Sequence, residues 1–232
     1  GFSLIKRRSF HRNELEDVTA YQIVPKDLTD KMKKGKSLFY LFSVNMSLNV
    51  SLYMLSQYFI QIYNKICDEF KNVFPFVSKI EIMRAQDFNL NLPGLAPVFA
   101  IKEKYIKDKW IPLNELSSGM QKILLILTDV YTFPEEGGIY LIDEYENSLG
   151  MNAINIFPDI LLEIENLSQC IITSHHPYII GNLPVRNWIV LHRKGNKVLV
   201  KNGSDLENKF SKSKQEAFIQ LINNCFYTEG VE

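Results

Sequence analysis

Three carboxylates follow one short apolar run of the sequence. The run covers residues 139–142, and Asp143, Glu144 and Glu146 come after it. An apolar run of this length, bounded by turn residues, is typical of a buried parallel strand, and open α/β sheets bind ligands at the carboxyl ends of such strands. Carboxylates there could hold a Mg²⁺ ion and activate a water molecule. Taken alone, the same residues also fit a strand that ends in a solvated acidic turn.

A second polar cluster follows another apolar run. Residues 170–173 predict a second buried strand, and Ser174, His175 and His176 follow it. Parallel strands that end in polar clusters bring those clusters to one edge of a sheet. We therefore expect the two strands to be parallel neighbours, with Asp143 and His175 close together. His176 is expected to pack or to cap rather than to react.

A third group of polar residues opens an apolar helix. Ser117, Ser118 and Gly119 precede a segment, residues 120–130, with apolar residues at helical spacing. The positive end of a helix, with its free N–H groups and nearby hydroxyls, is an anion site. A plain serine N-cap is the alternative explanation of this turn. Its position shortly before the acidic strand favours the anion site.

The chain resembles the catalytic half of ABC-type ATPases over residues 110–192, and most closely the RecF-, SMC- and OLD-like ATPases. Three motifs, in the family's order, carry the resemblance: Leu-Ser-Ser-Gly, Leu-Ile-Asp-Glu-Tyr-Glu and Ile-Thr-Ser-His-His-Pro. Many members of this class act on DNA or in antiphage defence. The resemblance implies an α/β P-loop NTPase fold, with a mixed sheet flanked by helices and a helical segment before the signature motif. It also implies ATP and Mg²⁺ as cofactors and ATP hydrolysis as the activity.

The resemblance also implies a role for each motif residue. Asp143 corresponds to the Walker B aspartate, which holds Mg²⁺ through water, and Glu144 to the base that orients the attacking water. His175 corresponds to the switch histidine, which contacts the γ-phosphate. Residues 116–120 correspond to the signature loop, in which Ser117, Ser118 and Gly119 bind the nucleotide and Ser117 and Gly119 touch the γ-phosphate held by the opposite subunit. Residues 147–149 fall in the D-loop. The implied assembly is a homodimer joined through its nucleotides, with DNA or an effector nuclease as further partners and no membrane.

No phosphate-binding P-loop is evident in the sequence. Gly35-Lys36-Ser37 resembles the end of GxxxxGK[ST], but Asp30 replaces the first glycine and no buried strand precedes it. We interpret this stretch as a solvated basic turn. The loop is then expected upstream of Gly1, or to have been removed, and the chain alone is expected to show negligible ATP hydrolysis. The sequence also departs from the family's pattern at Met120, Tyr145 and Gly150. We regard these three residues as tolerated variants.

Composition bounds the remaining functions. Lys plus Arg and Asp plus Glu both number 26, so net charge gives no sign of nucleic-acid or membrane binding, which would have to be local. No apolar run reaches the length of a membrane helix. Three well-separated cysteines fit neither a zinc site nor a disulfide framework, which favours free thiols in a reducing cytoplasm. We expect an N-terminal β/helical part, residues 1–109, and a catalytic part, residues 110–232.

The other elements are predicted from periodicity and turn residues. Helices are expected at 38–74, 152–167 and 214–223, the last with a capping box formed by Ser213 and Glu216. Strands are expected at 77–83 and 98–106, as an antiparallel pair within 2–24, and as a hairpin about Lys194-Gly195-Asn196.

Two other functions remain open from the sequence. A metal-dependent nuclease or phosphatase could use Asp143, Glu144, Glu146 and His175 around one or two ions, although residues 117–119 would then be idle. A non-catalytic dimerisation or sensor module would need only the scaffold, and the missing P-loop is compatible with it.

Overall fold

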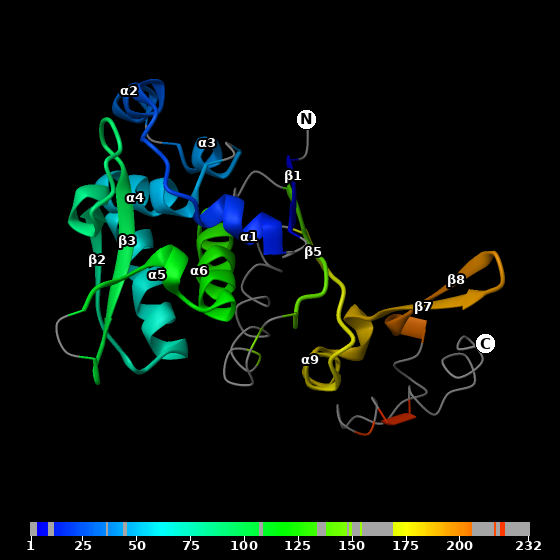
Figure 1. Cartoon of the computed structure of the whole chain (residues 1–232). Helices are drawn as coiled ribbons and strands as arrows, with labels where there is room; N and C mark the ends of the chain where they lie inside the picture. The colour runs from blue at the N-terminus through cyan, green and yellow to red at the C-terminus, as the bar shows by residue number, and fades with distance from the viewer. Residues whose placement is uncertain are drawn as a thin grey trace. The chain divides into compact units, whose positions relative to one another are not determined.

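The computed structural model divides the chain into two compact units, residues 1–172 and 173–232. The residues whose structure is described are 4–8, 12–35, 37–43, 46–106, 109–133, 138–147, 149, 154, 169–205, 216, 219 and 220. The first unit holds a parallel and an antiparallel sheet, and the second holds a hairpin (Figure 1).

A three-stranded parallel sheet positions the acidic residues. Its strands are β1 (Leu4–Arg8), β5 (Gly138–Ile142) and β6 (Gln169–Ile172). The central strand is β5, and Ile142 is in register with Arg8 on one side and with Ile172 on the other. The predicted parallel pairing of the two apolar strands is therefore confirmed. Tyr140 and Ile142 are buried while the alternate residues of β5 are partly exposed, so one face of this strand is buried more deeply than the other.

An antiparallel sheet lies in the same unit. Its strands are β2 (Val77–Arg84), β3 (Pro97–Glu103) and β4 (Ile111–Pro112). Helix α4 (Leu48–Tyr58) packs against β3, and the fully buried Asn49 fixes this contact. Its side-chain oxygen accepts from the N–H of Phe99 at 2.8 Å, and its amide nitrogen donates to the carbonyl oxygen of Thr19 at 3.1 Å. The two strands predicted in this region are confirmed.

Helix α6 connects the two sheets of the first unit. It spans Ser118–Tyr131, packs against α5 (Ile60–Val73), and carries Asp129, which contacts both β1 and β5. All residues from 120 to 130 are buried, as expected for a helix enclosed by other elements. Figure 1 shows α6 between the layer of the antiparallel sheet and strands β1 and β5. The helix predicted from the apolar spacing is confirmed.

The N-terminal segment differs from the predicted antiparallel strand pair. Strand β1 pairs with β5 in parallel, and part of the expected second strand belongs to helix α1 (Arg12–Thr19). Leu15, Val18 and Thr19 are buried, and their spacing of three and four residues defines one helical face. The prediction was wrong because it followed the β-propensity of residues 18–24 and neglected that spacing.

The described residues between 38 and 74 form three helices rather than the predicted single one. These are α3 (Leu38–Ser43), α4 and α5. Ser47 begins α4 as its N-cap, because its hydroxyl oxygen accepts from the N–H of Val50 at 3.4 Å. Phe59, with φ −137° and ψ 55°, separates α4 from α5. The apolar periodicity continues across such breaks and therefore does not reveal them.

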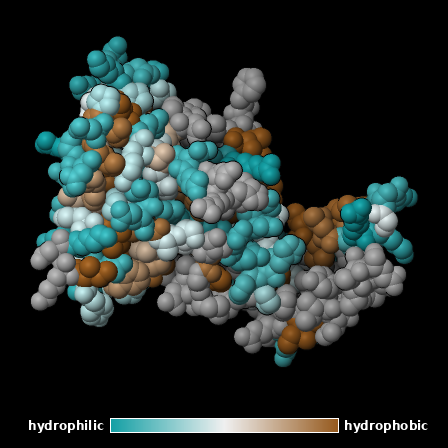
Figure 2. Space-filling view, viewed as in Figure 1, coloured by the Kyte–Doolittle hydropathy of each residue, from teal (hydrophilic) through white to brown (hydrophobic). Residues whose placement is uncertain are grey.

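The second unit contains the predicted hairpin. Its regular elements include α9 (Pro177–Asn182), β7 (Ile189–Lys194) and β8 (Lys197–Asn202). Trp188 and Val190 form a small core with partly buried neighbours on the preceding segment. Apolar side chains lie along the hairpin and hydrophilic ones at its tip (Figure 2). The exposed apolar residues of its two strands are Ile189, Leu191, Val198, Leu199 and Val200.

Two predicted helices fall mostly outside the described residues. Of the segment 152–167, only Ile154 is described, and it is helical. Ser213 also lies outside the described residues, whereas Glu216, Ile219 and Gln220 of the segment 214–223 are described and helical. Among the helices that are described, none has the length and apolar character needed to cross a membrane.

Two of the three cysteines lie in the described part of the chain. Cys67 and Cys170 both carry free thiols. Burial raises the pKa of Cys67 to about 11 and that of Cys170 to about 12. Both thiols therefore stay protonated at neutral pH, where the thiolate is the reactive form. The free thiols at these two positions agree with the prediction.

Candidate functional site

Asp143 lies directly after β5 with its carboxylate accessible. Its N–H donates to the carbonyl oxygen of Arg8 at 2.9 Å, which extends the ladder between β1 and β5 past the end of the strand. Its side chain is 45% exposed, and Oδ2 lies 3.9 Å from Nη2 of Arg7, a side chain that is 70% exposed. An ion pair of this length between exposed groups is weak. Arg7 therefore does not prevent the carboxylate from binding a cation.

Glu144 adopts a left-handed backbone conformation, with φ 46°. This conformation costs a side-chain-bearing residue about 1–2 kcal/mol, because Cβ crowds the following carbonyl. The residue opens a tight turn, in which the N–H of Asn147 donates to the carbonyl oxygen of Glu144 at 3.0 Å. The Glu144 side chain is exposed. The turn thus presents this carboxylate to solvent one residue after Asp143.

Ser117 caps helix α6, which is the alternative explanation that the sequence left open for this turn. Its hydroxyl oxygen accepts from the N–H of Met120 at 3.3 Å. Ser117 and Ser118 are exposed, and Gly119 is partly exposed. The amides of Ser118 and Gly119 belong to the first helical turn, where N–H groups have no acceptor within the helix. This end of α6 therefore has the donors and the positive dipole that an anion requires.

Gln121 fixes the chain just before α6. It is buried, and its side-chain amide donates to the carbonyl oxygens of Leu113 and Leu116, both at 3.1 Å. Its main-chain N–H donates to the carbonyl oxygen of Ser117 at 3.0 Å. These bonds satisfy main-chain carbonyls of the approaching segment and hold the serine turn in one position.

Lys122 joins helix α6 to the acidic turn. Its Nζ donates to the carbonyl oxygen of Asn147 at 2.7 Å and to that of Glu144 at 3.3 Å. The residue is fully buried, and Nζ lies 5.7 Å from the ring centroid of the buried Tyr145. A buried ammonium is costly unless acceptors surround it. These contacts therefore favour one arrangement of the helix and the turn.

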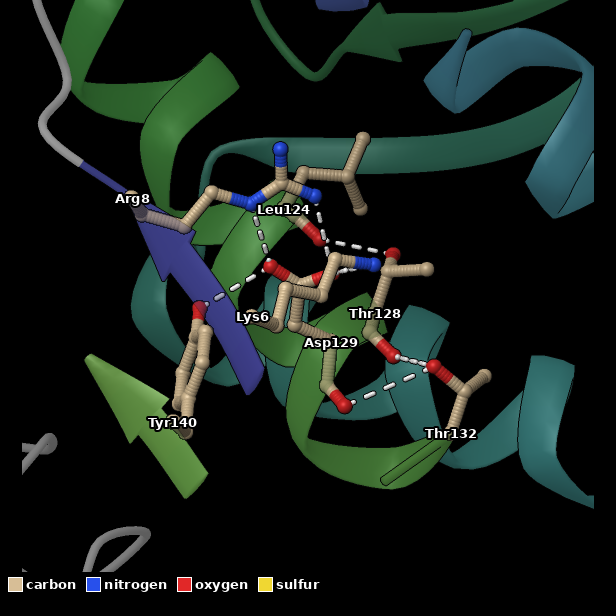
Figure 3. A network of polar contacts seen from close by, with 7 residues as sticks. All are labelled: Lys6, Arg8, Leu124, Thr128, Asp129, Thr132 and Tyr140. Carbon is tan, nitrogen blue, oxygen red and sulfur yellow. Dashed lines mark hydrogen bonds and ion pairs between the residues drawn. The ribbon is translucent and has the colours of Figure 1, made fainter. Parts of the chain in front are cut away.

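A buried network holds β1 and β5 against α6 (Figure 3). Arg8 donates to both carboxylate oxygens of Asp129, from Nε at 2.7 Å and from Nη2 at 3.0 Å. Nζ of Lys6 lies 2.9 Å from Oδ1, and the hydroxyl of Tyr140 donates to Oδ2 at 2.9 Å. The Asp129 side chain is only 3% exposed. This carboxylate is therefore enclosed by donors and serves the structure of the sheet.

The charges around Asp129 set its pKa. Burial alone would raise the pKa of the carboxyl group, but the adjacent Arg8 and Lys6 outweigh burial and hold it at about 2. Burial and the Asp129 charge raise the pKa of Tyr140 well above its ordinary value. At neutral pH Asp129 is therefore ionised, and Tyr140 keeps the proton that it donates.

The second polar cluster follows β6 at the start of the second unit. The hydroxyl oxygen of Ser174 accepts from the N–H of His176 at 3.1 Å, so His176 takes part in a local turn. His175 is exposed. Asp143 belongs to the first unit and His175 to the second, and their predicted proximity stays a prediction.

The Gly-Lys-Ser stretch follows a helix rather than a strand. Helix α2 (Lys26–Lys34) precedes it, and Gly35 ends the helix by donating its N–H to the carbonyl oxygen of Lys31 at 3.0 Å. Lys36 lies outside the described residues. The basic residues expected in a turn thus belong partly to the last turn of α2. A P-loop directly follows a buried strand, so the helix agrees with the interpretation that this stretch is not one.

Two charged residues of α6, Lys122 and Asp129, had no predicted role. Both interrupt the apolar pattern of residues 120–130. A charged residue inside a helix that is otherwise apolar indicates a buried partner, because charged groups are almost never fully buried alone. That signal identifies the residues but not their partners, which lie far away in the sequence.

The chain matches a known family over residues 8–181. The model of that family is described as "AAA domain, putative AbiEii toxin, Type IV TA system". A relative, the uncharacterized protein MJ1542 of Methanocaldococcus jannaschii, is 39% identical over 84 residues. The match covers 36% of this chain and 10% of that protein. The chain therefore corresponds to a small part of this relative's length.

Solved structures of Smc head domains have a similar fold. The head domain from Pyrococcus yayanosii, with its coiled coil and joint, is 15% identical, with a TM-score of 0.51 over 85% of this chain and 32% of that chain. The head domain from Pyrococcus furiosus, bound to the C-terminal domain of ScpA, is 15% identical, with a TM-score of 0.48 over 86% of this chain and 46% of that one. The first likeness confirms the predicted α/β P-loop NTPase fold. With a family match over more than half of its length, the chain belongs to this AAA domain family and has the fold of an ABC- and SMC-like ATPase head.

Proposed function

We propose that the chain is the catalytic half of an ATPase head that hydrolyses ATP between two copies of the protein. The observation that carries the proposal is the pair Asp143 and Glu144, two accessible carboxylates directly after the central parallel strand β5. Ligands of open α/β sheets bind at such strand ends. Lys122 supports the proposal further, because it joins the turn that begins at Glu144 to α6, the helix whose N-terminal end is the proposed anion site.

Asp143 has the chemistry to hold Mg²⁺. Its accessible carboxylate is a hard oxygen ligand, and Mg²⁺ in nucleotide sites binds one or two carboxylates together with substrate phosphates and water. In the described part of the chain no three His, Cys, Asp or Glu side chains form a metal-binding group. A single carboxylate is compatible with the nucleotide type of site. When bound, the ion would neutralise charge that develops on the phosphates.

The other motif residues act on the phosphate or on water. Glu144 orients the attacking water and accepts its proton, a contribution of about 10² to 10⁴ in rate. Residues 117–119 present hydroxyls and amides to the γ-phosphate of the nucleotide in the opposite subunit, and His175 contacts the same phosphate. Residues 1–109 form the supporting part of the head and residues 110–232 the catalytic part. The phosphate-binding loop is supplied from outside these residues.

The family's description supports a role in antiphage defence. It names a "putative AbiEii toxin" of a toxin–antitoxin system. In the proposed role, ATP-dependent closure of the dimer controls a protein partner such as an effector nuclease. DNA is a further proposed partner, and the proposed location of the head is the cytoplasm.

ATP-dependent dimerisation tests this proposal. In the complete protein, Glu144→Gln should bind ATP and form a stable dimer, because the nucleotide that joins the subunits is no longer hydrolysed. Adding Ser117→Arg should prevent the dimer, since a bulky cation would occupy the helix end that faces the phosphate. Gln57→Arg is the matched control, because it adds the same charge to an exposed residue of α4. Light scattering measures the dimer. If the protein with both Glu144→Gln and Ser117→Arg still dimerised with ATP, the proposal would be contradicted.

A further inference from the structure

Lys122 contacts the main chain of the acidic turn. The carbonyl oxygens that it binds belong to Glu144 and Asn147, which are the first and last residues of the turn. The ammonium reaches them from the second helical turn of α6, through a fully buried side chain. A long flexible side chain in a buried position loses its rotamer freedom, so this contact is specific to one geometry.

The contact of Lys122 involves Glu144, which has the least favourable backbone conformation in the site. Glu144 has φ 46°, and among the described residues other than glycine only Asn89 also has a positive φ. Such a conformation persists where the surrounding structure over-determines it. The carbonyl oxygen of Glu144 receives both the N–H of Asn147 at 3.0 Å and Nζ of Lys122 at 3.3 Å. Both donors can reach this oxygen only when the peptide plane after Glu144 has its observed orientation.

We propose that Lys122 is a positioning residue for ATP hydrolysis, which holds Glu144 in its left-handed backbone conformation and so aims the carboxylate at the attacking water. The inference rests on the proposed function, in which Glu144 is the base. The direction of the Cα–Cβ bond relative to β5 follows from the backbone angles at Glu144. A shift of those angles would displace the carboxylate while leaving Asp143 and the start of α6 in place.

The test is Lys122→Met in the complete protein. Methionine keeps an unbranched apolar stem and removes the donors. We expect kcat for ATP hydrolysis to fall by about 10- to 100-fold, the range associated with a catalytic group misplaced by about 1 Å. KM and the ATP dissociation constant should change by less than about twofold, because nucleotide binding does not use Glu144. Leu127→Ala is the control, a core truncation in the same helix; it should lower the melting temperature and leave kcat unchanged.

Hydrogen exchange provides a readout that does not depend on activity. In Lys122→Met, the amide of Asn147 should exchange faster than in the wild type, while amides of residues 125–131 keep their protection. In Leu127→Ala the Asn147 amide should be unaffected. If Lys122→Met does not fold, Lys122→Gln, which retains a shorter amide donor, is judged by the same measurements and should show the same direction of change.

The outcomes separate this inference from the proposed function. A wild-type protein that does not hydrolyse ATP, or a Glu144→Gln protein as fast as the wild type, would refute the proposed function. If those two behave as proposed and Lys122→Met retains its kcat, the positioning role is wrong. The same holds if kcat falls only as far as in Leu127→Ala, or if exchange at Asn147 is unchanged.

Discussion

Asp129 and Asp143 carry the same carboxylate group, and both lie beside strand β1. Each faces one arginine of that strand. Asp129 is 3% exposed and receives donors from Arg8 and Tyr140, whereas Asp143 is 45% exposed and lies 3.9 Å from Arg7. Successive residues of a strand point to opposite faces, so Arg7 and Arg8 serve opposite sides of the sheet. One side uses charge to hold strands against a helix. The other leaves a carboxylate accessible to a ligand.

The difference shows that burial and partners decide the role of a carboxylate. Breaking a buried ion pair leaves an uncompensated charge and costs about 3–5 kcal/mol, whereas an exposed pair contributes about 0–1 kcal/mol. The same substitution at the two positions should therefore separate stability from activity.

The largest expected effect is that of Asp129→Asn on stability. The amide removes the buried negative charge that faces Arg8 and Lys6, and we expect the free energy of unfolding to fall by about 3 kcal/mol. Asp143→Asn should change it by less than about 1 kcal/mol, while removing the proposed metal ligand. Urea denaturation of both variants measures the difference. Equal destabilisation would show that the two carboxylates are not distinguished as the structure indicates.

The pH dependence of stability sharpens the same contrast. The pKa of Asp129 is lowered to about 2 from its ordinary value of 3.8, so its ionised form stabilises the folded state above pH 3.8 and this contribution is lost as pH falls through about 2. The shift corresponds to about 2 kcal/mol. The stability difference between the wild type and Asp129→Asn should therefore shrink between about pH 5 and pH 2. A difference that stays constant over this range would contradict the assigned pKa.

The smallest expected effect concerns the serine turn. Ser117→Ala removes the acceptor for the N–H of Met120 and should destabilise the protein by about 1 kcal/mol. Ser118 is the next residue and does not form the cap. The free energy of unfolding of Ser118→Ala should therefore stay within about 0.5 kcal/mol of the wild-type value. Thermal unfolding of the two variants compares them directly. If Ser118→Ala proved the more harmful, Ser117 would not be the N-cap.

The parts of the site that local patterns specify could be predicted from the sequence. The apolar runs before Asp143 and Ser174 predicted two parallel strands, which are observed. The N-cap that the sequence offered as an alternative explanation of the serine turn is also observed. Strand run length and capping chemistry act between near neighbours in the chain. The roles of Asp143, Glu144, His175 and residues 117–119 follow from the family resemblance and stay proposals.

The remaining features depend on contacts between distant segments. Strand β1 pairs with β5, and Arg8 binds Asp129, across more than a hundred residues of sequence. No local pattern encodes that pairing, so the N-terminal segment was predicted wrongly. The breaks at Ser47 and Phe59 were hidden for a different reason, since apolar periodicity continues through them. The contact of Lys122 with the acidic turn likewise depends on how α6 lies against the end of β5.

The central claim is that Asp143 and Glu144 catalyse ATP hydrolysis. The most direct test is to measure phosphate release by the complete protein carrying Glu144→Gln. The amide preserves the shape of the side chain but cannot accept a proton from water. We predict that hydrolysis falls by at least about 100-fold, while the ATP dissociation constant changes by less than about twofold. Hydrolysis at the wild-type rate would contradict the claim.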